Sequence, residues 1–314
     1  FRYSVSANLG YNINKLTKYN GEYYNEWRVD DKGNPYYYNN IGSVSSGTTS
    51  RVIEGRMMEE YYLRTPYQGS GAYFNGDGSV NIGGGPRDGM IRTEKDMEWL
   101  KAMIAAGYTF EPNKNVSQTG IWYGDYIYAD SNGDGVYGNS DDQEFQDYNS
   151  TPKYNFGFQM SASWKNFDLS MSWAGAAGFK LYWGATTGYM SPSVRYGLSI
   201  NDKIASNHYF YDPNNPNDPR TNINAKYGRL VGAESGYQNQ VANTNYLFKG
   251  DYLTVGYTLP QSLANKIYMQ SLRVYFSGEN LCNITSFPGM DPELGANPTY
   301  TASRQFSFGV NVSF

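Results

Sequence analysis

The chain ends on the stretch RQFSFGVNVSF, Arg304–Phe314, in which large apolar residues alternate with small polar ones. Successive side chains of a β-strand point to opposite faces, so this pattern predicts a strand with one apolar and one polar face. In a soluble β-sandwich the apolar face packs inward. In an outer-membrane β-barrel the apolar face meets lipid and the polar face lines a wet lumen. The choice between these two folds largely decides the function.

The same alternation recurs in five earlier stretches of the chain. They are Phe1–Asn14, Tyr154–Trp164, Phe167–Ala174, Tyr252–Leu259 and Leu272–Glu279. With the terminal stretch they predict about six antiparallel strands, each near the ~9–11 residues that a tilted membrane strand needs.

The connections between these strands are of two kinds. Lys165–Asn166 and Pro260–Gln270 are short, whereas the segments 15–152, 180–245 and 285–301 are long and polar. Long loops on one side and short turns on the other are typical of outer-membrane barrels, with the long loops outside the cell. Closed barrels have about eight strands or more, so we expect this chain to be the C-terminal piece of a longer protein.

Composition excludes several classes of protein. Of the 314 residues 17% are aromatic, the net charge is -4, and there is one cysteine and one histidine. The mean hydropathy is -0.64, and no window approaches the ~20 apolar residues that a membrane-spanning helix needs. The negative charge disfavours nucleic acid, and Cys282 cannot form an intramolecular disulfide. With His208 as the one histidine, we expect no catalytic set and no bound organic cofactor, and therefore no enzyme.

The segment 15–152 is too long to lack structure of its own. Thr93 to Asp96 resemble a capping box, and the apolar residues that follow recur at helical spacing until Gly107, which predicts a helix over about 94–106. Two strand-like runs, near 53–64 and 121–129, predict either a hairpin outside the membrane or an added spanning pair.

One stretch carries an ion-binding pattern. DSNGDGVYGNSD, Asp130–Asp141, matches the calcium-loop pattern D-x-[DN]-x-[DN]-G-x5-E except for Asp at its last position. Gly135 permits the sharp bend, and Asp142 can replace the short final carboxylate. We expect a structural Ca2+ or a similar hard cation such as Mg2+; an Asx/Gly turn without metal is the alternative. The expected ligands are Asp130, Asn132, Asp134, the Val136 carbonyl, Asp141 and Asp142.

Aromatic residues in the long segments are candidates for substrate contact, because aromatic faces stack on sugar rings. Four residues carry this expectation: Trp122, Tyr123, Tyr126 and Trp183. Tyrosines also suit contact with a protein partner, so that reading stays open. Aromatic residues near strand ends are more often the interfacial girdle of a barrel.

Several motifs in order resemble one family. YADSNGDGVYGNSDD (Tyr128–Asp142), TPKYNFGFQMSASWKNFDLSMSWAGAAG (Thr151–Gly178), DYLTVGYTLPQSL (Asp251–Leu263), SLRVYFSGENL (Ser271–Leu281) and the terminal stretch resemble the C-terminal barrel portion of SusC-like (RagA-type) TonB-dependent outer-membrane transporters. The resemblance implies a 22-stranded transmembrane barrel in the outer membrane of a Gram-negative bacterium. The N-terminal plug and TonB box of such proteins are absent from this sequence.

The resemblance also implies partners and a function. A SusD-like lipoprotein would cap the barrel, the TonB-ExbB-ExbD system would supply energy, and the cargo would be an oligosaccharide or a peptide. The alternative from another class is a secreted, calcium-stabilised β-sandwich that binds glycans or acts as an adhesin. The segregated loops and the ordered motifs favour the transporter.

Overall fold

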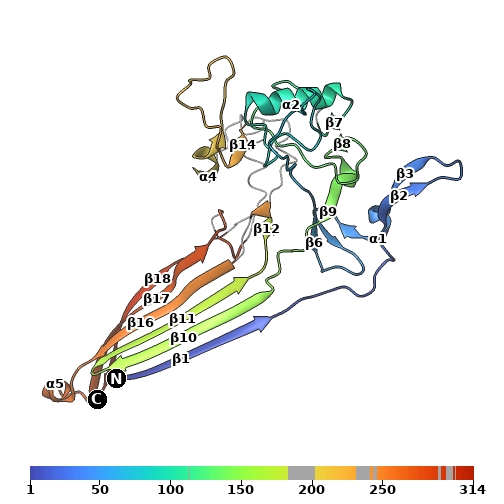
Figure 1. The fold of residues 1–314 in the computed structure, drawn as a ribbon. Coiled ribbons are helices and arrows are strands. Elements are labelled where there is room, and N and C mark those ends of the chain that lie inside the picture. The colour runs from blue at the N-terminus through green and yellow to red at the C-terminus, as the bar shows by residue number, and fades with distance from the viewer. Residues whose placement is uncertain are drawn as a thin grey trace. The chain divides into compact units, whose positions relative to one another are not determined.

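A computed structural model describes residues 1–112, 114–182, 202–230, 241–242, 246–288, 291–294, 300 and 302–314. The chain divides into two compact units (Figure 1). The sheet unit comprises Phe1–Asn14, Tyr148–Tyr182 and Ala242–Phe314, and the second unit comprises Lys15–Asp147 and Trp183–Val241. None of the described helices is long and apolar enough to cross a membrane.

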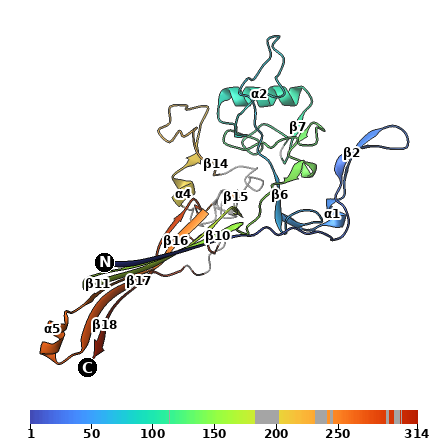
Figure 2. The ribbon, with the colours of Figure 1, turned by 60° about the horizontal axis from the view of Figure 1, so that its bottom comes forward.

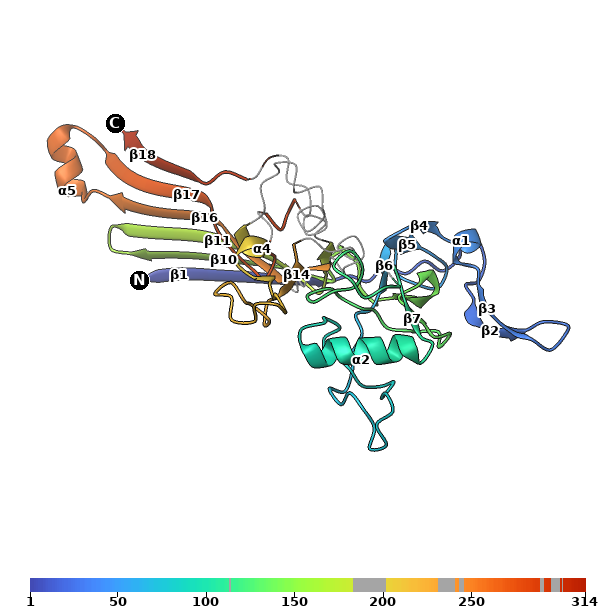
Figure 3. The same ribbon diagram turned by 90° about the horizontal axis from the view of Figure 1, so that it is seen from above.

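The sheet unit is built on one antiparallel sheet of six strands in the order β1-β10-β11-β16-β17-β18. Both termini and the short helix α5 (Gln261–Ala264), which a 3-10 turn (Asn265–Ile267) follows, lie at one end of this sheet (Figures 1 and 3). The strands are β1 (Arg2–Tyr11), β10 (Tyr154–Trp164), β11 (Phe167–Ala177), β16 (Tyr246–Thr258), β17 (Ser271–Thr285) and β18 (Gln305–Ser313). The six predicted strands are therefore confirmed.

Three of these strands continue beyond their predicted ends. β11 runs on to Ala177, β16 begins at Tyr246 and β17 reaches Thr285. The register shifts between Ser172 and Trp173 and between Gly250 and Tyr252. A bulge adds an unpaired residue and changes which side chains share a face, so the strict alternation of β16 and β17 ends where the bulge begins.

The alternation seen along each strand is aligned across the whole sheet. One row of paired residues carries only hydroxyl side chains: Ser4, Ser161, Ser170, Thr254, Ser277 and Ser307. The adjacent row lies on the opposite face and is apolar: Tyr3, Ala162, Leu169, Val255, Phe276 and Phe308. On the edge strands the apolar side chains are open, with Tyr3 73% and Phe308 84% exposed.

The second unit consists of short elements around the helix α2 (Glu94–Ala105) (Figure 2). Trp99, Leu100 and Met103 of α2 are fully buried and pack with Met90 and Phe110 in one apolar core. The other elements before the gap at 183–201 are β2 (Asn25–Val29), β3 (Pro35–Asn39), α1 (Ile41–Val44), β4 (Ser46–Gly47), β5 (Ser50–Val52), β6 (Glu60–Arg64), β7 (Thr109–Phe110), β8 (Val136–Tyr137), a 3-10 turn (Ser140–Asp142), β9 (Gln143–Phe145) and, in the sheet unit, β12 (Leu181–Tyr182). After the gap come α4 (Asp202–Ala205), β13 (His208–Tyr209), β14 (Tyr227–Arg229) and β15 (Val241–Ala242).

The predicted helix and its cap are confirmed. The Thr93 hydroxyl accepts a hydrogen bond from the Asp96 amide at 3.2 Å, and the Asp96 carboxylate accepts one from the Thr93 amide at 2.8 Å. This reciprocal pair satisfies two amide groups that the helix itself leaves without partners.

The predicted pairing of the runs 53–64 and 121–129 is wrong. β6 takes up only Glu60–Arg64 and pairs with β5 and β9, whereas 121–129 forms isolated bridges. Neither run joins the six-stranded sheet. The second run fails as a strand because Gly124 has a φ of +87° and turns the chain at its centre.

Candidate functional site

Two segments far apart in sequence form a pocket in the second unit. Residues 118–123 supply one wall and residues 205–230 supply the other, around a volume of about 740 Å3. Such a volume lies within the roughly 300–1,000 Å3 of small-molecule sites. We call it the aromatic pocket, because five of its lining residues are aromatic: Trp122, Tyr123, Tyr209, Phe210 and Tyr211.

The aromatic rings of the pocket pack edge to face. The ring centroids of Trp122 and Tyr123 are 5.3 Å apart, and those of Tyr123 and Tyr211 are 5.1 Å apart. Burial raises the pKa of the Tyr123, Tyr209 and Tyr211 hydroxyls, so these groups are neutral at physiological pH. The rings therefore present an uncharged surface.

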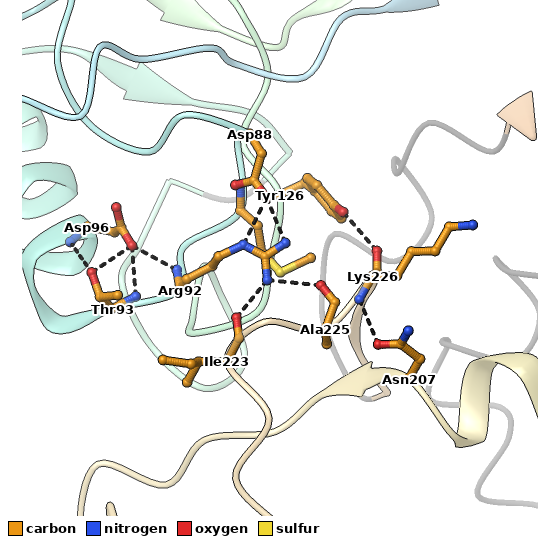
Figure 4. A network of polar contacts seen from close by, with 10 residues as sticks. Asp88, Arg92, Thr93, Asp96, Tyr126, Asn207, Ile223, Ala225 and Lys226 are labelled. Carbon is orange, nitrogen blue, oxygen red and sulfur yellow. Dashed lines mark hydrogen bonds and ion pairs between the residues drawn. The ribbon is translucent and has the colours of Figure 1, made fainter. Parts of the chain in front are cut away.

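Arg92, just before α2, holds the second wall in place (Figure 4). Its guanidinium donates to the backbone carbonyls of Ile223 and Ala225, at 2.7 and 2.9 Å, and to the carboxylate of Asp88. The Arg92 carbonyl in turn accepts a hydrogen bond from the Tyr209 hydroxyl at 2.6 Å. The segment 205–230 is thus fixed to the residue that leads into the helix.

Arg229 makes the reciprocal connection. From the end of β14 its guanidinium donates to both oxygens of the buried Asp125 carboxylate and to the carbonyls of Gln118 and Gly120. Arg92 thus binds the backbone of the second wall, and Arg229 of that wall binds the backbone of the first, so the pocket is preorganised.

A second ion pair lies at the pocket edge. Arg220 donates to both oxygens of Asp218, at 2.9 and 2.8 Å, and its guanidinium lies 4.5 Å from the centre of the Phe210 ring. The hydrogen bonds from Arg220 lower the pKa of Asp218 to about 2. Both arginines of the pocket are thus matched by a carboxylate.

The structure brings two of the four predicted substrate-contact residues together. Trp122 and Tyr123 line the aromatic pocket, whereas Tyr126 does not. The Tyr126 hydroxyl instead donates to the Lys226 carbonyl at 3.3 Å, and burial raises its pKa to about 12 (Figure 4). Trp183 lies outside the described residues. A role in substrate contact stays a prediction for all four.

Sequence reasoning missed the second wall. The run Tyr209-Phe210-Tyr211 is a local cluster of three aromatic residues in a polar segment, which was the one available signal. His208, for which the sequence suggested no role, also lines the pocket, and its Nδ1 lies 2.8 Å from the Ala205 carbonyl oxygen.

The predicted cation loop, residues 130–142, is closed by its own hydrogen bonds. The Asp130 carboxylate accepts from the amides of Gly133, Asp134 and Gly135, at 2.7, 3.2 and 2.9 Å. Gly135 has a φ of +82°, which confirms the bend expected there. The Asn132 amide nitrogen donates to the Asp134 carboxylate at 3.1 Å, and the Asn132 side-chain oxygen accepts from the Asp134 amide at 3.0 Å, so the third and fifth predicted ligands are hydrogen-bonded to each other.

Asp141 and Asp142, the last two predicted ligands, differ in burial and in the hydrogen bonds that they accept. Asp142 is fully buried and accepts from four backbone amides, those of Ser131, Asn132, Gly138 and Asn139. These donors use the acceptor capacity of both its oxygens. Burial raises the pKa of Asp142 to about 6, against the opposing effect of the amides. Among the described residues, Asp141 accepts from one group, the Asn39 side chain, at 3.4 Å.

No group of three or more His, Cys, Asp or Glu side chains converges as a metal site within the described ranges. The side-chain oxygens of the loop suit a hard cation in type. Val136, whose carbonyl was expected to serve as a ligand, lies in β8 beside Thr109 of β7. A cation at this loop therefore stays a prediction.

An ion pair lies on the polar face of the sheet unit. Arg273 of β17 donates to both oxygens of Asp168 of β11, at 2.9 and 2.5 Å, across the intervening strand β16. In the row of hydroxyls, Ser170 lies two residues along β11 from Asp168, and Ser277 lies four residues along β17 from Arg273.

Sequence comparison finds a transport-related protein. The chain is 26% identical over 211 residues to TonB-dependent receptor P3 of Formosa agariphila, a match that covers 61% of this chain and 19% of the relative. No protein-family model matches the chain.

Solved structures share the fold. The chain is similar to the RagAB peptide transporter, with a TM-score of 0.54 at 17% identity, and to the RagAB peptide importer in its closed-closed state, with a TM-score of 0.58 at 18% identity. Each match covers 99% of this chain and 27% of the solved chain. The chain thus spans about a quarter or less of the proteins it matches. Its resemblance to the C-terminal portion of SusC-like, RagA-type TonB-dependent transporters is confirmed, by a relative in sequence and by solved structures in fold.

Proposed function

We propose that the protein containing this chain imports a nutrient across the bacterial outer membrane in a TonB-dependent manner. The chain would supply C-terminal strands of a 22-stranded barrel, with the segments 15–152 and 180–245 outside the cell. The six-stranded sheet carries this proposal. Its row of hydroxyl residues and its row of apolar residues both run in register through all six strands, and the two rows lie on opposite faces. A lipid-facing outer surface and a wet inner surface need this arrangement.

The exposed apolar face favours a membrane over a sandwich. A β-sandwich buries such a face beneath a second sheet about 10 Å away. In the described part of the sheet unit there is one large sheet, and Leu9, Phe306 and Phe308 on its edge strands are largely exposed. Lipid is the cover that this face fits best.

The proposed partners come from the resemblance and from the relatives. We infer a SusD-like lipoprotein at the extracellular side and the TonB-ExbB-ExbD system at the periplasmic side, through a part of the protein outside this sequence. The solved structures of similar fold are named for a two-part peptide importer, RagAB, which supports a partner of this kind. The cargo would be an oligosaccharide or a peptide, and the transport would involve no covalent chemistry. A structural Ca2+ or Mg2+ in the loop 130–142 would stiffen the extracellular part.

Two measurements test the proposal. The native protein should be recovered from the outer-membrane fraction and released only by detergent; recovery in a soluble fraction would contradict a barrel. A strain without the protein should lose uptake of one nutrient, and a plasmid copy should restore it. Uptake that is unchanged for every oligosaccharide and peptide on which the parent strain grows would contradict import.

A further inference from the structure

We propose that the aromatic pocket binds uncharged sugar rings of a glycan and discriminates against acidic sugars. This assignment names a substrate class for the proposed importer, and its role in uptake rests on that function. The binding itself rests on three features of the pocket: its ring surfaces, its free polar atoms and the pairing of both its arginines with carboxylates.

The ring surfaces suit the apolar side of a pyranose. Trp122 and Tyr211 are partly exposed, and Tyr123 lies edge-on between them. A sugar ring carries C–H groups on its faces, which pack on aromatic faces, and it carries hydroxyls around its edge. A pocket that combines several aromatic rings with polar atoms therefore matches both parts of the ligand.

Three polar atoms at the pocket are free to meet hydroxyl groups. Among the described residues, the indole N–H of Trp122 and the hydroxyl of Tyr123 have no hydrogen-bond partner. In neutral His208 the proton on Nδ1 faces the Ala205 carbonyl, which leaves Nε2 as an acceptor. A sugar hydroxyl both donates and accepts, so it can satisfy each of these groups. A purely apolar ligand would leave them unpaired at a cost.

The charges at the pocket exclude acidic sugars. Both arginines that line the pocket already make two hydrogen bonds to a carboxylate, Arg229 to Asp125 and Arg220 to Asp218. Beyond these pairs, the charges at the pocket are acidic: Glu94 accepts a hydrogen bond from the Tyr211 hydroxyl at 3.0 Å, and Glu98 and Asp212 act electrostatically on the Tyr123 and Tyr211 hydroxyls. Neither arginine is therefore a free positive charge that would attract a uronate or a sulfate. An anion that took over Arg229 would strand the buried carboxylate of Asp125, which costs several kcal/mol.

The sheet unit supports the same substrate class independently. Its polar face is rich in hydroxyls, and its described charged side chains balance: Arg2 and Arg273 against Asp168 and Glu279. In the proposed barrel this face lines the lumen. A wall of hydroxyls with balanced charge suits a polar, uncharged solute.

Isothermal titration of the full-length protein in detergent tests the assignment. The probes are cellotetraose, maltotetraose, mannotetraose and xylotetraose as uncharged glycans, tetragalacturonate as the charged one, and a blocked tetrapeptide that contains one tyrosine. We expect at least one uncharged tetrasaccharide to bind, and to bind about tenfold or more tighter than tetragalacturonate and the peptide. Trp122→Ala should weaken that binding about tenfold, since this corresponds to the loss of about 1.4 kcal/mol.

Matched variants separate a lost contact from a lost fold. Trp122→Phe keeps an aromatic face and should retain most of the affinity that Trp122→Ala loses. Tyr36→Ala removes an exposed aromatic residue of β3, outside the pocket, and should leave binding unchanged. Equal binding by Trp122→Ala and Tyr36→Ala would overturn the assignment.

The other outcomes are equally decisive. If none of the uncharged tetrasaccharides binds, or if tetragalacturonate or the peptide binds as tightly or more tightly, the assignment is wrong. A deletion strain that still takes up the bound tetrasaccharide would contradict the proposed import and leave the pocket assignment standing. A deletion strain that loses uptake of a nutrient that does not bind at the pocket would support the proposed import and contradict the pocket assignment.

Discussion

The guanidinium of Arg229 donates hydrogen bonds of 2.7 and 2.6 Å to the carboxylate of Asp125, a residue 104 positions earlier in the chain. Asp125 is fully buried and the Arg229 side chain is 13% exposed. Removal of one partner from a buried ion pair leaves a charge without compensation and costs about 3–5 kcal/mol. The pair therefore fixes the guanidinium of Arg229, which also donates to the carbonyls of Gln118 and Gly120 in the facing wall of the aromatic pocket.

Asp125→Ala should loosen the pocket and thereby make the segment 205–230 more sensitive to protease. The double variant Asp125→Ala with Arg229→Met should recover part of the lost stability, because no buried charge is left without a partner. Lys114→Ala is the control, since Lys114 and Glu111 form an exposed pair whose loss costs little. Limited proteolysis and thermal unfolding of the detergent-solubilised protein measure both effects. Equal protease sensitivity of Asp125→Ala and Lys114→Ala would show that the pair does not hold the walls.

Gly124→Ala should lower the stability of the fold more than replacement of a glycine that has free space around it. Gly124 has a φ of +87°, and a Cβ atom there would collide with the Tyr209 ring in the pocket wall. We expect a loss of about 2–4 kcal/mol from backbone strain and overpacking together. Gly107→Ala, at a φ of +100° with nothing within 4 Å of the added atom, should show only the backbone part, about 1 kcal/mol. A difference of zero between the two variants in thermal unfolding would argue against the close contact with Tyr209.

Tyr126 should make the stability of the second unit fall at high pH. Burial raises the pKa of Tyr126 to about 12, above its unfolded value of about 10. The folded chain therefore holds this proton more tightly, and the contribution is complete below about pH 10 and is lost as the pH rises through about 12. Tyr126→Phe should flatten this fall by at most about 2–3 kcal/mol.

Near neutral pH, Tyr126→Phe should cost only the hydrogen bond to the Lys226 carbonyl, about 1 kcal/mol. Denaturant unfolding at a series of pH values, with tyrosinate absorbance followed in wild type and variant, checks both statements. Identical pH profiles for the two proteins would show that Tyr126 ionises as freely in the folded chain as in the unfolded one.

The sequence was most informative where structure is local. Alternation located all six strands of the sheet, and the spacing of Thr93 and Asp96 located the helix with its cap. The ends of β16 and β17 were missed because the register shift around Asp251 breaks the alternation in both strands. This irregularity is set by pairing between strands and leaves no periodic mark in the sequence of either. The end of β11 was missed because its last residues, Gly175–Ala177, are small and do not alternate in polarity.

The aromatic pocket depends on contacts between residues far apart in the sequence, which local patterns do not reveal. Arg92 meets Ile223 across 131 positions, and Arg229 meets Asp125 across 104. A hydrogen bond between such distant residues has no characteristic spacing, so no local pattern predicts it. Trp122 and Tyr123 could be singled out as aromatic residues in a long segment, but their facing wall at Tyr209–Tyr211 depends on those two arginines.

The loop 130–142 should respond differently to two kinds of variant. If Ca2+ binds, it should protect the loop from protease, and Asp130→Ala with Asp134→Ala should abolish that protection by removing two ligands. Asp142→Asn should weaken the loop with and without Ca2+, because an amide cannot accept from all four backbone N–H groups that now meet this carboxylate. Proteolysis with added Ca2+ and with a chelator separates the two effects. Wild-type cleavage that does not depend on the chelator would favour a turn without metal.

The neighbours Phe308 and Ser307 test which face of the sheet meets lipid. They lie on opposite faces of β18, paired with Phe276 and Ser277 of β17. In a barrel, a carboxylate at position 308 would enter hydrocarbon, at a cost of up to about 2–4 kcal/mol, whereas one at position 307 would enter a wet lumen. Phe308→Asp should therefore lower the amount of this protein that is found folded, and so resistant to heat denaturation, in the outer membrane. Ser307→Asp should leave that amount near the wild-type level. The opposite order would place the apolar face inside, as in a sandwich, and an equal effect of the two variants would show that neither face meets lipid.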